Sequence, residues 1–359
     1  MKAGNFKGAL LEYIIRELLK SCGFSNVKSD GLYAFERSGL YFLNGKGAAH
    51  DADIIMNPPI QMPFAYPTQL IFECKAYASS LSLPIVRNAL GLRNDLNDFE
   101  IVTKKSLLKR QNNRRADYAI EQRNRYLYQV GVASINLFTR PAVEFAANNK
   151  IPLISLSWFL SQPVIDLING INQRFIDSLP NNAVENLYSF FKDRNGDINS
   201  NEYLAAKNLI AEEPTIREII HFARLSIKYS YVGLLETGDL VFLFAKTKSE
   251  NNILNRITSF SDLLAEIHWQ SDRPNVWTLT VSSRSERNES TEFDFFVPDK
   301  ILRRWEKFNF DKNEALNIKE DFFSKIFVFN NKNNNLAPFS IISIDAEWLY
   351  RARRRLNEQ

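Results

Sequence analysis

Three polar side chains, Asp53, Glu73 and Lys75, stand out because their types and spacing suit phosphate chemistry. Glu73 and Lys75 lie in the apolar run 70–75, and side chains two apart in a strand share a face. Asp53 lies in a second short run, 50–56, and antiparallel pairing of the two runs would bring the trio together. Two carboxylates can hold Mg²⁺, which polarises a phosphoryl oxygen, while a lysine stabilises developing charge. The trio therefore predicts a site for a divalent metal and a negatively charged substrate.

This pattern by itself has low specificity, because an ordinary polar sheet edge with a surface Glu and Lys has the same sequence pattern. The loop between the runs carries four prolines, which cannot continue either strand's ladder. Its length leaves the pairing register open. Cys74 lies on the opposite face from Glu73 and Lys75 and is predicted to be a buried thiol.

A helix is predicted at residues 6–20, where apolar side chains recur at helical spacing and Gly23 follows as a stop. Glu12 falls at the border of the apolar stripe. On residue physics alone, it is expected to be solvated and paired with Arg16 one turn later. The alternative is a carboxylate that leans over the sheet toward the metal.

The remainder of the first 165 residues predicts a mixed α/β unit. Pro84 suits the start of a helix over residues 85–98. A strand at 130–138, a short helix and a strand at 151–156 predict a right-handed crossover with parallel strands. An opening helix, an antiparallel part with the acidic residues and this crossover together form one predicted unit.

The most basic stretch of the chain is 104–125, with three interleaved tyrosines at its end and just beyond. Its cations either form a solvated helix face or contact a phosphate backbone, where each displaces a counterion. The candidate nucleic-acid-binding residues are Lys104, Lys105, Lys109, Arg110, Arg114 and Arg115.

Length and pattern predict three parts: 1–165, a helical connector over 166–230, and a strand-rich α+β part over 231–359. The calcium-like loop at 193–202 lacks the required glycine, so it is interpreted as an Asn-rich turn. Most of the late tryptophans are expected to pack in a core. Six strands are predicted in the last part: 231–236, 240–246, 276–282, 293–297, 326–330 and 339–344.

Composition is that of an ordinary soluble protein, with 45% hydrophobic and 24% charged residues. The net charge of +4 is uneven, because residues 1–165 carry +7 and the remainder carries −3. The first part is therefore the one suited to a polyanion. Two cysteines exclude a disulfide framework or a zinc site, and no apolar run approaches the roughly 18 residues of a membrane span. With no signal-peptide pattern, a cytoplasmic protein is expected.

The order of these features resembles the PD-(D/E)XK nuclease superfamily, and within it the Mrr-like restriction endonucleases. The opening helix with Glu12, the Gly-led turn before His50-Asp51-Ala52-Asp53, and the closing strand–helix–strand at 133–156 carry the resemblance. It covers roughly the first 160 residues and implies a restriction-endonuclease-like mixed β-sheet flanked by helices. It does not extend to the strand-rich part.

The resemblance implies roles residue by residue. Asp53, Glu73 and the backbone carbonyl of Cys74 would bind Mg²⁺, or Mn²⁺ in its place. Lys75 would be the catalytic lysine and Glu12 an auxiliary carboxylate. Asp51 remains an alternative ligand, although Asp53 is preferred because an apolar stretch follows it directly. His50 is interpreted as structural.

The expected function is a Mg²⁺-dependent endonuclease that hydrolyses phosphodiester bonds in DNA, in restriction or anti-phage defence. The C-terminal part would select the target. DNA is the expected partner, a homodimer is the assembly considered, and no membrane partner is expected. Two alternatives stay open: a non-catalytic nucleic-acid-binding or assembly subunit that keeps the nuclease fold, and a ligand-gated nuclease acting on DNA or RNA.

Overall fold

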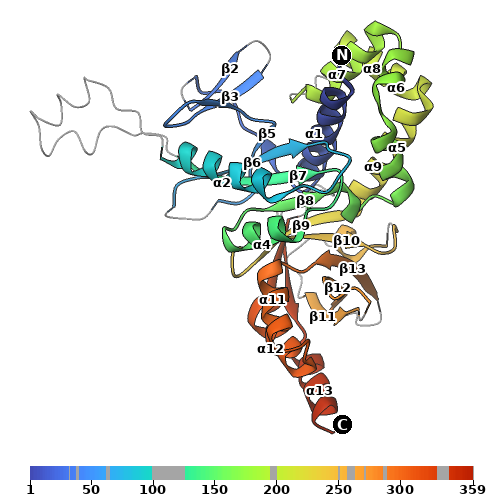
Figure 1. Cartoon of the computed structure of the whole chain (residues 1–359). Coiled ribbons are helices and arrows are strands. Elements are labelled where there is room, and N and C mark those ends of the chain that lie inside the picture. The colour runs from blue at the N-terminus through green and yellow to red at the C-terminus, as the bar shows by residue number, and fades with distance from the viewer. Residues whose placement is uncertain are drawn as a thin grey trace, which may run out of the picture.

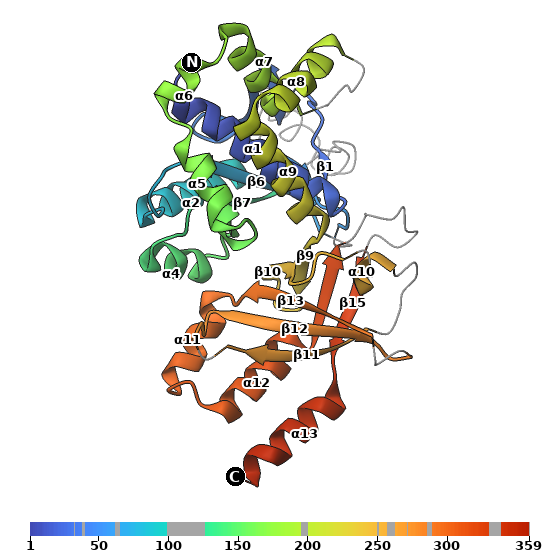
Figure 2. The same ribbon diagram turned by 90° about the vertical axis from the view of Figure 1, so that its right-hand side faces the viewer.

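The structure of the chain is a computed structural model (Figure 1). It describes residues 1–31, 33–37, 40–61, 65–98, 126–194, 200–249, 251–256, 263–270, 272–285, 289–329 and 339–358. A mixed sheet with helices on both faces adjoins a β-barrel, and the C-terminal helix lies beyond the barrel, far from the N-terminus (Figure 2).

The sheet has five strands in the order β1-β5-β6-β7-β8. Its β1–β5 and β5–β6 pairs are antiparallel, whereas its β6–β7 and β7–β8 pairs are parallel. The predicted antiparallel pairing around the acidic residues is confirmed, with Ile54 opposite Phe72. The strands are β1 (Ser25–Asn26), β5 (Ile54–Asn57), β6 (Thr68–Lys75), β7 (Leu127–Ser134) and β8 (Leu153–Ser155).

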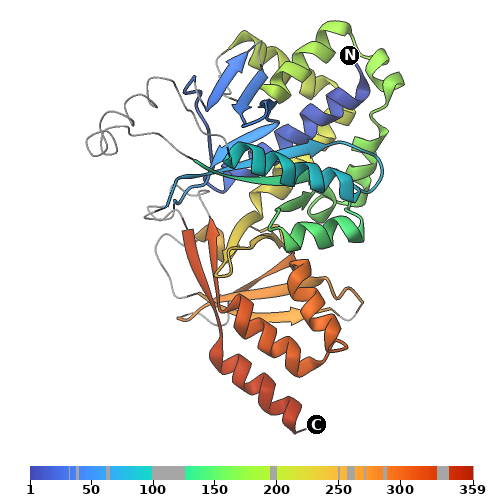
Figure 3. The same ribbon diagram turned by 60° about the vertical axis from the view of Figure 1, so that its left-hand side comes forward.

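Helices cover both faces of this sheet. Helix α1 (Ala3–Ser21) packs on the face that carries the β6 side chains Phe72 and Cys74. Helices α2 (Leu83–Asn97) and α4 (Arg140–Asn148) cover the opposite face (Figure 3). The mixed α/β architecture and the β7–α4–β8 crossover predicted from the sequence are therefore confirmed.

A second, three-stranded sheet corrects one prediction. It has the order β2-β3-β4 and contains β2 (Ala34–Arg37), β3 (Leu40–Asn44) and β4 (Ala49–Asp51). The run 50–56 was predicted as one strand, but it divides at Ala52–Asp53 between β4 and β5, which belong to different sheets. Ala52 still donates its N–H to the Tyr41 carbonyl at 2.9 Å. Asp51 and Asp53 therefore do not share the face of one strand.

The residues predicted to be helical after position 165 do form helices, and these make a layer beside α1 (Figure 2). Phe191 and Phe6 meet edge to face, with ring centroids 5.6 Å apart, and join the last turn of α7 to α1. The elements are η1 (Leu156–Trp158), α5 (Gln162–Gly170), α6 (Gln173–Ser178), α7 (Asn181–Lys192), α8 (Asn201–Glu212) and α9 (Pro214–Lys228).

The C-terminal part is a closed barrel in the order β10-β13-β12-β11-β15-β14-β9. All six predicted strands are present, and β11 (Leu263–Trp269) is one more that the sequence pattern missed. The others are β9 (Ser230–Leu235), β10 (Leu240–Ala245), β12 (Val276–Ser283), β13 (Ser290–Phe296), β14 (Lys325–Phe329) and β15 (Phe339–Ile344). Its helices are α10 (Ile253–Arg256), α11 (Asp299–Lys307), α12 (Lys312–Phe323) and α13 (Ala346–Asn357).

Trp277 and Trp305 are fully buried in the barrel core, as predicted for most of the late tryptophans. The core around α1 also takes in Val232 and Phe242 from the barrel, so apolar packing runs continuously between the two parts. Among the described residues, no helix is both long and apolar enough to cross a membrane.

Candidate active site

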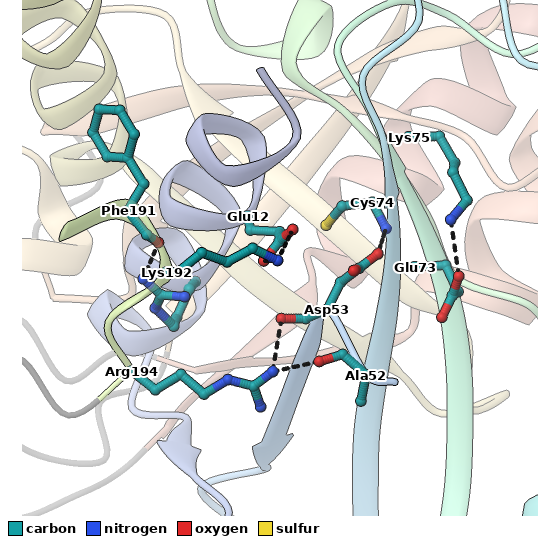
Figure 4. Close-up of polar contacts among 10 residues, drawn as sticks. Glu12, Ala52, Asp53, Glu73, Cys74, Lys75, Phe191, Lys192 and Arg194 are labelled. Atoms are coloured by element: carbon teal, nitrogen blue, oxygen red, sulfur yellow. Dashed lines mark hydrogen bonds and ion pairs between the residues drawn. The ribbon is translucent and has the colours of Figure 1, made fainter. Parts of the chain in front are cut away.

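The break between β4 and β5 sets the direction of Asp53. Asp53 precedes Ile54, which is paired with Phe72 of β6, so its side chain lies beside the next residues of β6. Its Oδ2 accepts a hydrogen bond from the backbone N–H of Cys74 at 2.8 Å (Figure 4). The structure thus joins Asp53 by a hydrogen bond to the strand that carries Glu73 and Lys75.

Glu73 and Lys75 form an ion pair on the α2 side of β6, with Lys75 Nζ 3.0 Å from Glu73 Oε2. Burial and the nearby charge of Asp53 raise the pKa of Glu73. Burial lowers the pKa of Lys75, but Glu73 and Asp53 outweigh it and the net change is upward. Lys75 therefore stays protonated at neutral pH.

Glu12 corrects the expectation from residue physics alone, and not the role that the resemblance implied. The sequence predicted a solvated side chain paired with Arg16, but Glu12 is only 4% exposed. Its two carboxylate oxygens accept hydrogen bonds from Lys192 Nζ at 2.7 and 2.8 Å, whereas Arg16 donates to the backbone carbonyl of Phe191 at 2.8 Å. Helix α7 packs against α1, and its last residue, Lys192, meets Glu12 there.

Negative charge is concentrated around Asp53. Burial, followed by the charge of Asp53, raises the pKa of Glu12 to about 7, against the opposing effect of Lys192. Burial and Asp53 also raise the pKa of Asp51. The charge of Asp53 therefore disfavours ionisation of three neighbouring carboxyl groups, those of Glu12, Asp51 and Glu73.

Two cations that the sequence reasoning did not select also reach this place. Lys192 ends α7, and Arg194 follows two residues later. Arg194 Nη2 donates to the backbone carbonyls of Ala52 and Asp53, and its guanidinium lies 4.7 Å from the ring centre of Tyr41 (Figure 4). Both residues follow the acidic motif by more than 100 positions, so no local spacing pattern indicates them.

A metal would find oxygen donors here. Asp53 Oδ1 and Glu73 Oε1 make no hydrogen bond among the described residues. In a strand, the carbonyl of a residue points to the same side as its N–H, and the N–H of Cys74 points to Asp53. The pairing of β5 with β6 ends at Ile54 and Phe72, so no β5 residue pairs with Cys74. Carboxylate and carbonyl oxygens suit Mg²⁺. Within the described residues, however, no three His, Cys, Asp or Glu side chains already converge as a metal cage.

The remaining predicted residues lie apart from Asp53. His50 Nε2 is 2.7 Å from Asp95 Oδ2, which ties the Gly-led turn to α2 and fits the structural role predicted for it. Cys74 is buried, and burial raises its pKa, so the predicted buried thiol is confirmed. The six basic candidates Lys104, Lys105, Lys109, Arg110, Arg114 and Arg115 lie outside the described residues.

No protein-family model matches this chain, and no curated protein matches it. Among solved structures, the crystal structure of a protein of unknown function, AF1548, is similar over 60% of this chain and 98% of its own. The two are 14% identical and superpose with a TM-score of 0.32, which carries no assignment of fold or function.

Proposed function

We propose that the protein is a Mg²⁺-dependent endonuclease that hydrolyses phosphodiester bonds in DNA. The observation that carries this proposal is the position of Asp53. Its carboxylate is held on the N–H of Cys74, and its charge raises the pKa of Glu12 and Glu73. Carboxylates that disfavour one another's ionisation gain most from a divalent cation.

The residues divide the chemistry between them. Asp53, Glu73 and the Cys74 carbonyl would hold Mg²⁺, with Mn²⁺ as a substitute. The bound ion supplies Lewis acidity toward a phosphoryl oxygen and a more acidic water. Lys75 keeps its proton through its contact with Glu73, so its ammonium can stabilise charge that develops on the phosphate. Glu12, with a pKa about 7, can accept or release a proton near neutral pH.

The order of elements supports a restriction-endonuclease-like fold for this part. Helix α1 carries an acidic residue, β1, β5 and β6 form an antiparallel group, and the α4 crossover links the parallel strands β7 and β8. This is the arrangement that the resemblance to Mrr-like nucleases implied. A role in restriction or anti-phage defence, with the barrel selecting the target DNA, follows from the same resemblance.

Plasmid cleavage tests the proposal. Purified protein is expected to nick plasmid DNA with Mg²⁺ or Mn²⁺ and to lose this activity in EDTA. Lys75→Ala is expected to abolish nicking but to retain DNA binding. Lys246→Ala is the matched control, since it removes a lysine–carboxylate pair with Glu292 on the barrel. Undiminished nicking by Lys75→Ala contradicts the assignment. DNA binding by the wild type without metal-dependent nicking favours the non-catalytic alternative.

One observation favours a second candidate, a nuclease gated by a small ligand. A cavity of about 690 Å³ lies between the sheet and the barrel, within the size range of small-molecule sites. Residues of both parts line it, including Leu153, Trp158, Leu240 and Phe296. Filling it with Leu240→Trp is expected to abolish a ligand-dependent change in nicking rate and in thermal stability. Equal responses of Leu240→Trp and wild type to a panel of small amphipathic ligands contradict this candidate.

A further inference from the structure

The last turn of α7 and the two residues after it bring two cations to the candidate active site. Lys192 and Arg194 belong to the helical layer, outside the part of the sequence that carries the acidic motif. Figure 4 shows them approaching Glu12 and Asp53 from the side opposite to β6. Neither is needed by the mechanism described above, so what they do there requires its own explanation.

Lys192 donates hydrogen bonds to both carboxylate oxygens of Glu12. Its Nζ lies 2.7 Å from Glu12 Oε1 and 2.8 Å from Oε2, although its own side chain is 28% exposed. Two charge-assisted hydrogen bonds from one ammonium group restrict rotation of the carboxylate and so favour a single orientation of it. The side chain of Glu12 is 5% exposed, so solvent cannot provide these bonds in place of Lys192.

Arg194 holds the backbone at the strand break. Where a strand ends, its carbonyls need another donor, and Arg194 Nη2 donates to those of Ala52 and Asp53. The guanidinium also lies 4.7 Å from the ring centre of Tyr41, whose carbonyl accepts the Ala52 N–H. The ring and both carbonyls therefore fix the turn from which the Asp53 side chain leaves for Cys74.

Two arginines at the junction of α7 and α1 have buried N–H donors that are unpaired among the described residues. Nη1 of Arg194, and Nε and Nη1 of Arg16, are buried and have no hydrogen-bond partner among the described residues. Unpaired buried donors cost free energy, so a purely structural link between α7 and α1 would be served better by apolar side chains. Lys192 and Arg194 beside the carboxylates of Glu12 and Asp53 instead suit a site in which these carboxylates must be held in a fixed orientation.

We infer that the end of α7 completes the candidate active site, with Lys192 as the positioning residue for Glu12 and Arg194 as the positioning residue for Asp53. This inference rests on the proposed nuclease function. It means that residues 1–165 contain every motif residue but not a finished site. The connector is then a part of the catalytic unit and not only a link to the barrel.

Kinetics of four full-length variants test the inference. Lys192→Met and Arg194→Gln are expected to lower kcat for plasmid nicking by roughly 10²-fold, the scale of a misplacement of about 1 Å. The KM for DNA should change little, because neither residue touches substrate. Lys192→Arg keeps a charge that can bind both oxygens and should restore most of kcat. Arg194→Lys keeps a donor for the two carbonyls but loses the planar guanidinium beside Tyr41, so it should restore less. Lys246→Met is the control, since its pair with Glu292 lies on the barrel.

Hydrogen–deuterium exchange gives a readout that does not depend on activity. The Cys74 N–H is protected by Asp53, so Arg194→Gln should speed exchange in a peptide covering residues 73–76. A peptide over α12 should be unchanged. This comparison also shows whether each variant is folded, because general unfolding would raise exchange in both peptides.

The outcomes separate the two proposals. If the wild type nicks DNA and both charge-removing variants nick within about twofold of it, the positioning roles are wrong and the nuclease assignment stands. If the wild type nicks no nucleic acid with any metal, the nuclease assignment is wrong. The Arg194 role is then decided by exchange alone: faster exchange at 73–76 supports it, and unchanged exchange overturns it. A charge-removing variant that fails to fold is replaced by a second variant without the charge, Lys192→Gln or Arg194→Met, under the same criteria.

Discussion

Replacing Glu12 by glutamine is expected to make the protein increasingly more stable than the wild type as the pH rises from about 4.5 to about 7. Burial and the charge of Asp53 raise the pKa of this carboxyl in the folded chain above its usual value of 4.5. Protonated Glu12 is therefore favoured by folding. That stabilisation is complete below about pH 4.5 and is lost as the pH rises through about 7.

The magnitude follows from the size of the change. A rise of the pKa from 4.5 to about 7 corresponds to about 3 kcal/mol, at roughly 1.4 kcal/mol per pH unit. Glutamine resembles the protonated acid and can still accept a hydrogen bond from Lys192. The free energy of unfolding of Glu12→Gln, relative to wild type, should therefore increase by up to about 3 kcal/mol across this window.

Urea unfolding at a series of pH values measures this difference, followed by both far-UV circular dichroism and tryptophan fluorescence. Coincident transitions by the two probes are required before a free energy is taken. Glu17→Gln is the control, because its carboxylate is on the same helix but at the surface, 3.3 Å from Lys20. Parallel pH profiles for Glu12→Gln and wild type would refute the reasoning about a buried, mutually repelling group of carboxylates.

Three further perturbations distinguish parts of the structure. Asp53→Asn is expected to lower plasmid nicking by roughly 10²-fold or more, whereas Asp51→Asn should cost less than roughly tenfold; equal losses contradict the preference for Asp53. Gly131→Ala would place a Cβ 2.5 Å from Cε1 of Phe72, and urea unfolding should show a loss of roughly 1–3 kcal/mol, with an unchanged midpoint arguing against so tight a sheet. Burial lowers the pKa of Lys319 to about 8, so Lys319→Met should raise the thermal midpoint at neutral pH. Loss of two cation–π contacts offsets part of this stabilisation, so the free energy of unfolding should increase by on the order of 1 kcal/mol. The increase should shrink above about pH 8, and an increase that does not vary with pH contradicts the reasoning.

Much of the local structure could be predicted from the sequence. The helical spacing of leucines and isoleucines predicted α1, and Gly23 ends it with a φ of 89° that favours glycine. Short apolar runs between turn residues predicted β6 and the paired β5. The six barrel strands were found by the same signal. These features depend on neighbours a few residues apart, so periodicity and turn residues carry the information.

The strand break at Ala52–Asp53 could not be predicted in this way. Alternation treats 50–56 as one strand, and nothing local in those residues forbids it. The break depends on two partners outside the run: β3, which pairs with β4, and the distant Arg194, whose guanidinium binds the carbonyls at the break. Which aspartate faces β6 is therefore decided by the pairing of two different sheets.

The environment of Glu12 has the same origin. The helix pattern placed it at the border of an apolar stripe, where solvent on the polar side is the ordinary outcome. In the folded chain, α7 covers that side and delivers Lys192 from 180 residues away. The types of residue needed for phosphate chemistry, and the strands that carry them, were determined by the sequence alone. Asp53 was also preferred from the sequence. Its contact with β6, and the burial and charge balance of the group, were decided by tertiary structure, because each depends on helices and strands that meet only after folding.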